Sequence, residues 1–176
     1  MGAKRLTTAA AGALLIISAV AGCSSGGSGR TPSGYVRGDA KALTVAYPKD
    51  WQRGPDGDAA LSVQAPPRTA TLSVVTGLGE RARPEMLEAT IEAASMMNAR
   101  DYHRTGSKSI KVAGAKNALR VDFTFSGFRG TGAPGQAADV GVIGKNGTMH
   151  VVRLIWQRGR LKDEVVDDVI DSIRVR

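Results

Sequence analysis

A single cysteine, Cys23, follows an apolar, uncharged run over residues 6–21, and this placement limits what the chain can fold into. One cysteine excludes an intrachain disulfide framework and any cysteine-rich zinc or iron–sulfur site. The 176 residues are 42% hydrophobic and 23% charged, proportions typical of a globular protein that exclude wholesale disorder. This length suits one domain and is too short for two domains of ordinary size.

The N-terminal residues have the layout of a secretory signal peptide, with a short basic start, the apolar run and the sequence VAGC. VAGC resembles the lipobox of bacterial lipoproteins, in which small residues admit the backbone to the signal peptidase and the cysteine thiol accepts a diacylglyceryl group. We therefore predict a lipoprotein signal peptide over residues 1–22 and a lipid anchor at Cys23. The anchor would hold the protein to the cell membrane on its extracytoplasmic face. The alternative is an ordinary signal peptide with a chance cysteine.

Residues 24–40 are rich in serine and glycine, a composition that cannot bury a core. Together with the lipidated Cys23 they predict a flexible linker over residues 23–40. At residue 41 the pattern changes, and apolar residues begin to alternate with polar or small ones. We therefore place a single folded domain at residues 41–176.

Two hydrophobic periods divide this predicted domain. Alternation of apolar with polar residues predicts β-strands, and apolar residues three or four positions apart predict helices. The pair Asn146-Gly147 between two strand patterns predicts a hairpin, because both turn residues must accept positive φ. Strands joined by short turns are antiparallel, so the predicted fold class is α+β. The expected strands are 43–47, 59–63, 71–76, 102–112, 119–125, 140–143 and 149–156, the expected helices are 84–100 and 161–172, and a short closing stretch is expected at 173–175.

The spacing within each expected helix indicates which side faces the core. In the first helix, Leu87, Ile91, Ala94 and Met97 or Asn98 share one face, and glutamates line the opposite face. The inner residues expected of the second helix are Val165, Val166, Val169 and Ile170.

The beginning and the end of the predicted domain resemble the PsbP-like α/β/α sandwich superfamily, which includes LpqN-type actinobacterial lipoproteins. The resemblance rests on the sequence LTVAYPKDWQ at residues 43–52 and on the tail SIRV at 172–175. It covers residues 41–176 and implies an antiparallel β-sheet with helices packed on both faces. It also implies no obligatory cofactor and no shared catalytic residues, and members of the superfamily act as accessory or protein-binding subunits.

Neither the charge nor the glycines indicate a nucleotide or nucleic-acid site. The formal net charge of +8 includes basic residues of the signal peptide and is not clustered, so nucleic acid is not expected as a partner. Residues 130–135 match G-x-G-x-x-G, but a strand pattern follows where a dinucleotide loop would lead into a helix. A mobile hairpin loop is the simpler interpretation.

The ionisable residues also have simple structural interpretations. Asp50, Asp56 and Asp58 lie close together but lack the spacing of a calcium loop, so turns are favoured over a metal site. His103 and His150 would be a candidate base or ligand pair, yet no motif for nucleophilic or metal-dependent hydrolysis accompanies them. We expect no cofactor, no metal and no enzymatic activity.

Trp51, Phe128 and Arg129 form the candidate binding surface. Trp51 is expected either to cap one end of the core or to be an exposed anchor for a partner. Phe128 and Arg129 lie beside the glycine-rich loop, where an aromatic and a basic side chain would be presented together.

The predicted function is that of a lipid-anchored, non-enzymatic module that binds another protein of the cell envelope. The alternative is a carrier that holds a small apolar or lipid ligand between sheet and helix. The residues expected to line such a pocket are Met86, Met96, Met97, Phe123 and Phe125.

Overall fold

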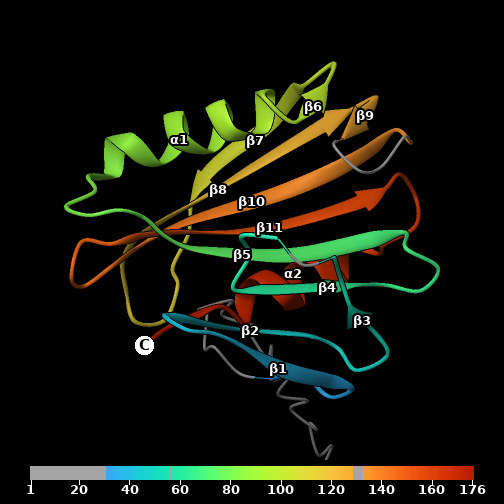
Figure 1. Cartoon of the computed structure of the whole chain (residues 1–176), viewed down its shortest axis with the longest axis horizontal. Helices are drawn as coiled ribbons and strands as arrows, with labels where there is room; N and C mark the ends of the chain where they lie inside the picture. The colour runs from blue at the N-terminus through green and yellow to red at the C-terminus, as the bar shows by residue number, and fades with distance from the viewer. Residues whose placement is uncertain (1–30, 56, 129–132) are drawn as a thin grey trace, which may run out of the picture.

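The computed structural model describes residues 31–55, 57–128 and 133–176 (Figure 1). The predicted signal peptide and Cys23 lie outside the described residues, as do Asp56, Arg129 and most of the glycine-rich loop. Predictions about them therefore stay predictions. Within the described part of the chain, no helix is both long enough and apolar enough to cross a membrane.

A seven-stranded antiparallel sheet forms the centre of the molecule (Figure 1). The long strand predicted from Met149 lies between two others, and Val152, Leu154 and Trp156 on one of its faces belong to the main hydrophobic cluster. In spatial order the strands are β3 (Gln52–Arg53), β4 (Leu61–Gln64), β5 (Ala70–Gly79), β11 (Met149–Gln157), β10 (Gly135–Gly144), β8 (Ala115–Phe125) and β7 (His103–Ser109).

The predicted hairpin joins β10 to β11. Gly147 has φ of +82°, and its N–H donates to the Gly144 carbonyl at 2.9 Å. The expectation that both residues of the Asn-Gly pair take positive φ is wrong for Asn146, because the turn closes from Gly144 to Gly147 and only the glycine takes the left-handed conformation. The register pairs Val140 with Val152 and Ile143 with Met149. Alternating residues of this hairpin therefore face opposite sides of the sheet, a pattern that positions the candidate site described below.

A smaller three-stranded sheet contains β1 (Tyr35–Ala40), β2 (Leu43–Pro48) and β12 (Arg174–Val175). The linker predicted over residues 23–40 is therefore wrong at its C-terminal end, because residues 35–40 form a strand. All six residues of β1 pair with β2, and Ala40 is completely buried. Gly38 explains part of the error: a Cβ there would lie 2.7 Å from a Leu61 methyl carbon, so close packing requires the glycine that suggested a linker.

Helix α1 (Pro84–Met96) is shorter than predicted, and residues 99–100 form β6 (Ala99–Arg100), which pairs with β9 (Gly127–Phe128). Its buried residues are Leu87, Ile91 and Ser95, which follow an i, i+4, i+8 spacing. Of the two alternatives predicted for the last inner position, Met97 is wrong, since that side chain is 80% exposed, whereas Asn98 is partly buried. The last buried residue of α1 is therefore a serine, Ser95.

Helix α2 (Asp163–Asp171) buries Val166, Val169 and Ile170, as predicted, whereas Val165 is only partly buried. These residues join the largest hydrophobic cluster together with Val140 and Val142 of β10. Leu87 of α1 instead packs against Ile143 and Met149. The Ser172 hydroxyl, just after α2, accepts a hydrogen bond from the Ala46 N–H of β2 at 2.7 Å, which fixes α2 to the small sheet.

The α+β class is confirmed by these elements. The single antiparallel sheet that was predicted is wrong: the described strands divide into the seven-stranded sheet, the three-stranded sheet and the two-stranded pair of β6 and β9. Helix α2 shares its hydrophobic cluster with β1 and β2 of the three-stranded sheet. In the three-stranded sheet, β2 pairs with β1 on one side and with β12 on the other.

Candidate functional site

Part of one face of the large sheet is left open beside α1. The helix contacts β8 and β10, and the neighbouring strands β11, β5 and β4 line an open groove of about 820 Å³. We call this the polar groove. Its central lining residues are Ser62, Gln64, Thr71, Ser73, Arg153 and Gln157.

Strand alternation explains why these residues line the groove. On β5, Leu72 between Thr71 and Ser73 is completely buried in the main hydrophobic cluster. On β11, Leu154 follows Arg153 and is buried in the same cluster. Successive side chains of a strand point to opposite faces, so a core on one side leaves a polar row on the other.

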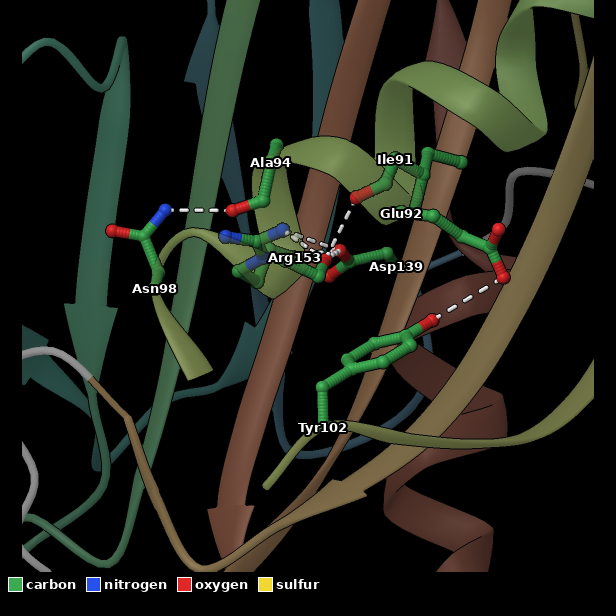
Figure 2. Close-up of polar contacts among 8 residues, drawn as sticks. Ile91, Glu92, Ala94, Asn98, Tyr102, Asp139 and Arg153 are labelled. Atoms are coloured by element: carbon green, nitrogen blue, oxygen red, sulfur yellow. Dashed lines mark hydrogen bonds and ion pairs between the residues drawn. The ribbon is translucent and has the colours of Figure 1, made fainter. Parts of the chain in front are cut away.

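Arg153 and Asp139 form an ion pair on the floor of this region (Figure 2). The two residues are direct partners in the β10–β11 register. Arg153 Nε donates to Asp139 Oδ1 at 2.8 Å, and Nη2 donates to Oδ2 at 2.5 Å. The Asp139 side chain is 0% exposed and that of Arg153 is 15% exposed, so the carboxylate depends on this guanidinium for its compensation.

Ser95 connects this ion pair to α1. Its Oγ accepts a hydrogen bond from Arg153 Nη2 at 2.7 Å. The same oxygen lies 2.8 Å from Asp139 Oδ2 and 2.8 Å from the Ile91 carbonyl, and its single proton can be donated to only one of them at a time. The Ser95–Asp139–Arg153 network therefore joins the helix, β10 and β11 at one point.

Aromatic and amide groups surround the exposed side of Arg153. Its guanidinium carbon lies 5.2 Å from the ring centroid of Phe128, within the range of a cation–π contact. Asn98, which also lines the groove, donates from Nδ2 to the Ala94 carbonyl at 2.7 Å at the end of α1 (Figure 2). Of these two groups, the Phe128 ring contacts the guanidinium, while the Asn98 amide is bonded to the end of α1.

Among the described lining residues of the groove, positive side chains outnumber negative ones. The arginines are Arg53, Arg68 and Arg153, and the carboxylate is Asp58. Asp139 lies beneath Arg153 and offsets part of that charge. The groove can donate hydrogen bonds to an anionic or carbonyl oxygen of a bound molecule.

A phenol close to this network is held in its protonated form. Burial, followed by the negative charge of Glu92, raises the pKa of Tyr102 to about 12. Its hydroxyl donates to Glu92 Oε1 at 3.5 Å (Figure 2), and Glu92 pairs with Arg104 at 3.0 Å. The phenol is protonated at neutral pH even at its ordinary pKa of about 10, so the raised pKa extends this donor state to more alkaline pH.

The predicted site residues are not brought together. Trp51 is 8% exposed and belongs to the main hydrophobic cluster, so of its two alternatives the structure favours the core position over an exposed anchor. Phe128 lies in the polar groove against Arg153. Arg129 lies outside the described residues.

The two histidines are far apart in the fold. His103 begins the exposed edge strand β7, whereas His150 is buried on β11 and accepts a hydrogen bond from the Gly77 N–H at 3.3 Å. Burial lowers the pKa of His150. Over residues 31–55, 57–128 and 133–176, no three His, Cys, Asp or Glu side chains lie close enough together to hold a metal ion.

The residues expected to line a carrier pocket are also separated. Met86 and Met96 of α1 and Met97, just after the helix, are exposed. Phe123 and Phe125 are buried, and their ring centroids lie 6.2 Å apart in a packed aromatic row that also includes Tyr102 and Phe128.

The sequence signal for the network was present but dispersed. Asp139 lies among small residues, Arg153 lies in an apolar strand, and Ser95 occurs in a helix. Pairing the hairpin about Asn146 would have placed Asp139 opposite Arg153, since each lies seven positions from it. Nothing in the local pattern points to Ser95.

Comparison with known proteins identifies the fold. No protein-family model and no curated protein matches the sequence. Among solved structures, cyanobacterial PsbP (CyanoP) from Synechocystis sp. PCC 6803 matches with a TM-score of 0.54 at 12% identity, over 82% of this chain and 94% of that chain. The Ran-binding protein Mog1p of Saccharomyces cerevisiae matches with a TM-score of 0.52 at 6% identity, over 80% and 95% of the two chains.

A further match is LpqN of Mycobacterium tuberculosis, a protein involved in cell envelope biogenesis. It shares 20% identity with a TM-score of 0.44, over 80% of this chain and 90% of that chain. The resemblance predicted from the opening motif and the closing tail is confirmed at the level of the fold, and the chain has a PsbP-like fold.

Proposed function

We propose that this protein is a lipid-anchored, non-enzymatic module that binds another protein on the extracytoplasmic face of the cell membrane. The anchor is the diacylglyceryl group proposed for Cys23, and the processed chain would begin at that residue. The body is a PsbP-like domain that we interpret as a sheet with α1 and α2 on opposite faces, supported by their packing against alternate residues of β10.

The polar groove is the observation that carries this proposal. Its floor holds a guanidinium fixed by a buried carboxylate, a serine and an aromatic ring. Such a surface suits recognition, because its donors are already oriented and lose little freedom on binding. Mog1p, which has the same fold, is described as a Ran-binding protein, and the present chain would likewise bind a protein through this fold.

The proposed tether and the groove belong to different sides of the large sheet. Ala40 and Leu43 of the small sheet join the cluster that contains Leu72 and Leu154, on the face opposite the groove. In Figure 1, β1 lies at the bottom of the molecule and α1 at the top. Thr31 and Gly34 already accept hydrogen bonds from Arg37 and Lys49 of the domain. A linker over residues 24–30 would span roughly 13–16 Å, and the groove would face away from the membrane.

The carrier alternative is less well supported. Its three methionines are exposed on α1 and just after it, while its two phenylalanines are packed in the interior. An apolar ligand would need these groups around one cavity.

In-cell crosslinking of the anchored full chain, followed by identification of the crosslinked species, tests this proposal. A protein of the cell envelope enriched above a matched anchored control domain is the expected result. Copurified lipid with no enriched protein would contradict protein binding and favour the carrier.

A further inference from the structure

We infer that the polar groove binds an extended, acidic segment of the partner protein, with one of its carboxylates placed against Arg153. The inference rests on the proposed function and specifies which surface and which chemistry would serve it. It follows from the orientation of one guanidinium, from the charge and polarity of the lining, and from where the groove lies relative to the tether.

The guanidinium of Arg153 has one side engaged and one side facing the groove. Nε and Nη2 make all of its described hydrogen bonds, to Asp139 and Ser95. Among the described residues, Nη1 makes none, and the side chain lines the groove. A guanidinium carries five N–H donors in a rigid plane, so Nη1 can donate to a carboxylate while the other nitrogens keep their partners.

The charge around the groove favours an anionic partner. Arg68 lies on the rim and makes no ion pair within the described part of the chain, and Arg53 lines the groove beside it. The only carboxylate among the groove's described lining residues is Asp58. Exposed arginines at a rim steer an acidic partner and strengthen its binding most at low ionic strength.

The uncharged lining favours a polypeptide over a compact anion. Ser62, Ser73 and Thr71 carry hydroxyl groups, and Gln64 and Gln157 carry amides. These groups both donate and accept hydrogen bonds, which matches the alternating N–H and C=O groups of an extended backbone. Phe128 and Ile155 add apolar surface for its side chains.

The position of the groove favours an acidic protein segment over anionic lipid headgroups, which would also be near an anchored protein. The groove lies on one face of the large sheet, and β1 packs on the side of the opposite face. β1 is the first element after the proposed tether. A headgroup would therefore have to reach the face turned away from the bilayer.

The test uses the full chain in a neutral detergent and a fluorescent peptide of alternating aspartate and serine, with an asparagine–serine peptide as the neutral probe. Binding is measured by fluorescence anisotropy at low and moderate salt. We expect the acidic peptide to bind more tightly than the neutral one, and to shift the Arg153 Nε–H resonance in an isotope-labelled sample. Arg68→Glu should weaken binding about fivefold or more, as expected for loss and reversal of an exposed charge.

Arg160→Glu is the matched control, because Arg160 is exposed and lies outside the groove. Equal weakening by both variants, or no difference between the two peptides, would overturn the inference. Displacement of the peptide by short-chain phosphatidylglycerol at lower concentration than by unlabelled peptide would also overturn it, in favour of a headgroup site.

A photocrosslinker placed at Gln157 and, separately, at Arg160 in the anchored chain distinguishes this inference from the proposed function. Crosslinking of the same envelope protein from Arg160 and not from Gln157 would overturn the groove as the binding surface while leaving protein binding intact. Crosslinking from Gln157, lost in Arg68→Glu, is the expected result.

Discussion

The two residues of the buried ion pair should respond unequally to neutral substitution. Asp139→Asn removes the charge that compensates Arg153, but the 15% exposed guanidinium can turn toward water in the groove. Arg153→Gln leaves a carboxylate that is 0% exposed and that, among the described residues, keeps Ser95 as its one side-chain partner. Removing one partner of a buried pair costs about 3–5 kcal/mol of unfolding free energy. We expect Asp139→Asn to lower the unfolding free energy by about 3 kcal/mol and Arg153→Gln to lower it by about 5 kcal/mol.

The assay is urea denaturation of the chain beginning at residue 24, followed by fluorescence of the two buried tryptophans, Trp51 and Trp156. A loss of about 3 kcal/mol should also lower the Tm by roughly 6–12 °C for a domain of this size. The double variant should be less destabilised than the sum of the two single variants, by about 2 kcal/mol, since the residues share one network.

The exposed ion pair between Asp39 and Arg176 supplies the control. Its side chains are 60% and 51% exposed, and Arg176 Nη2 lies 2.5 Å from Asp39 Oδ2. Asp39→Asn should therefore cost less than about 1 kcal/mol. A similar cost for Asp39→Asn and Asp139→Asn, or a larger cost for Asp139→Asn than for Arg153→Gln, would refute the role assigned to burial.

Two further predictions concern pH and backbone geometry. Burial lowers the pKa of His150, so as the pH falls the unfolded chain binds a proton at this residue before the folded chain does, and stability should fall below about pH 6.5. In His150→Gln, the urea midpoint should decline less steeply with acid than in the unsubstituted protein. An unchanged slope would contradict this prediction. Gly114 has φ of +79°, and a Cβ there would collide with the Val175 carbonyl oxygen. Gly114→Ala should therefore lower the unfolding free energy by about 2–4 kcal/mol. It should also speed hydrogen exchange of the Val175 amide, which donates to the Ala113 carbonyl. Gly159→Ala, at φ of +72° with no atom within 4 Å, should cost only about 1 kcal/mol, and equal costs would count against the collision.

The sequence predicts the strongly patterned elements well. The strand over 119–125 and the hairpin about Asn146 both appear, because clean alternation and an Asn-Gly turn each favour one local structure. Strand β1 was missed, because Gly38 and the charged residues around it obscure the alternation, and only pairing with β2 makes the segment a strand.

The candidate site was largely beyond local pattern. Phe128 was identified as a binding residue, but Arg153 was hidden in a strand dominated by apolar residues. Ser95, Asp139 and Arg153 are distant in sequence and become neighbours only when α1 packs over the hairpin. Trp51 was a candidate by residue type, and its burial depends on how the main cluster closes around it.

The most direct test of the central proposal is the intact mass of the N-terminal peptide of the protein purified from membranes. We predict a chain that starts at Cys23 and carries a diacylglyceryl group, with palmitate labelling lost in Cys23→Ser and that variant released from the membrane. A product found in the cytosol with residues 1–22 still attached would contradict the proposal.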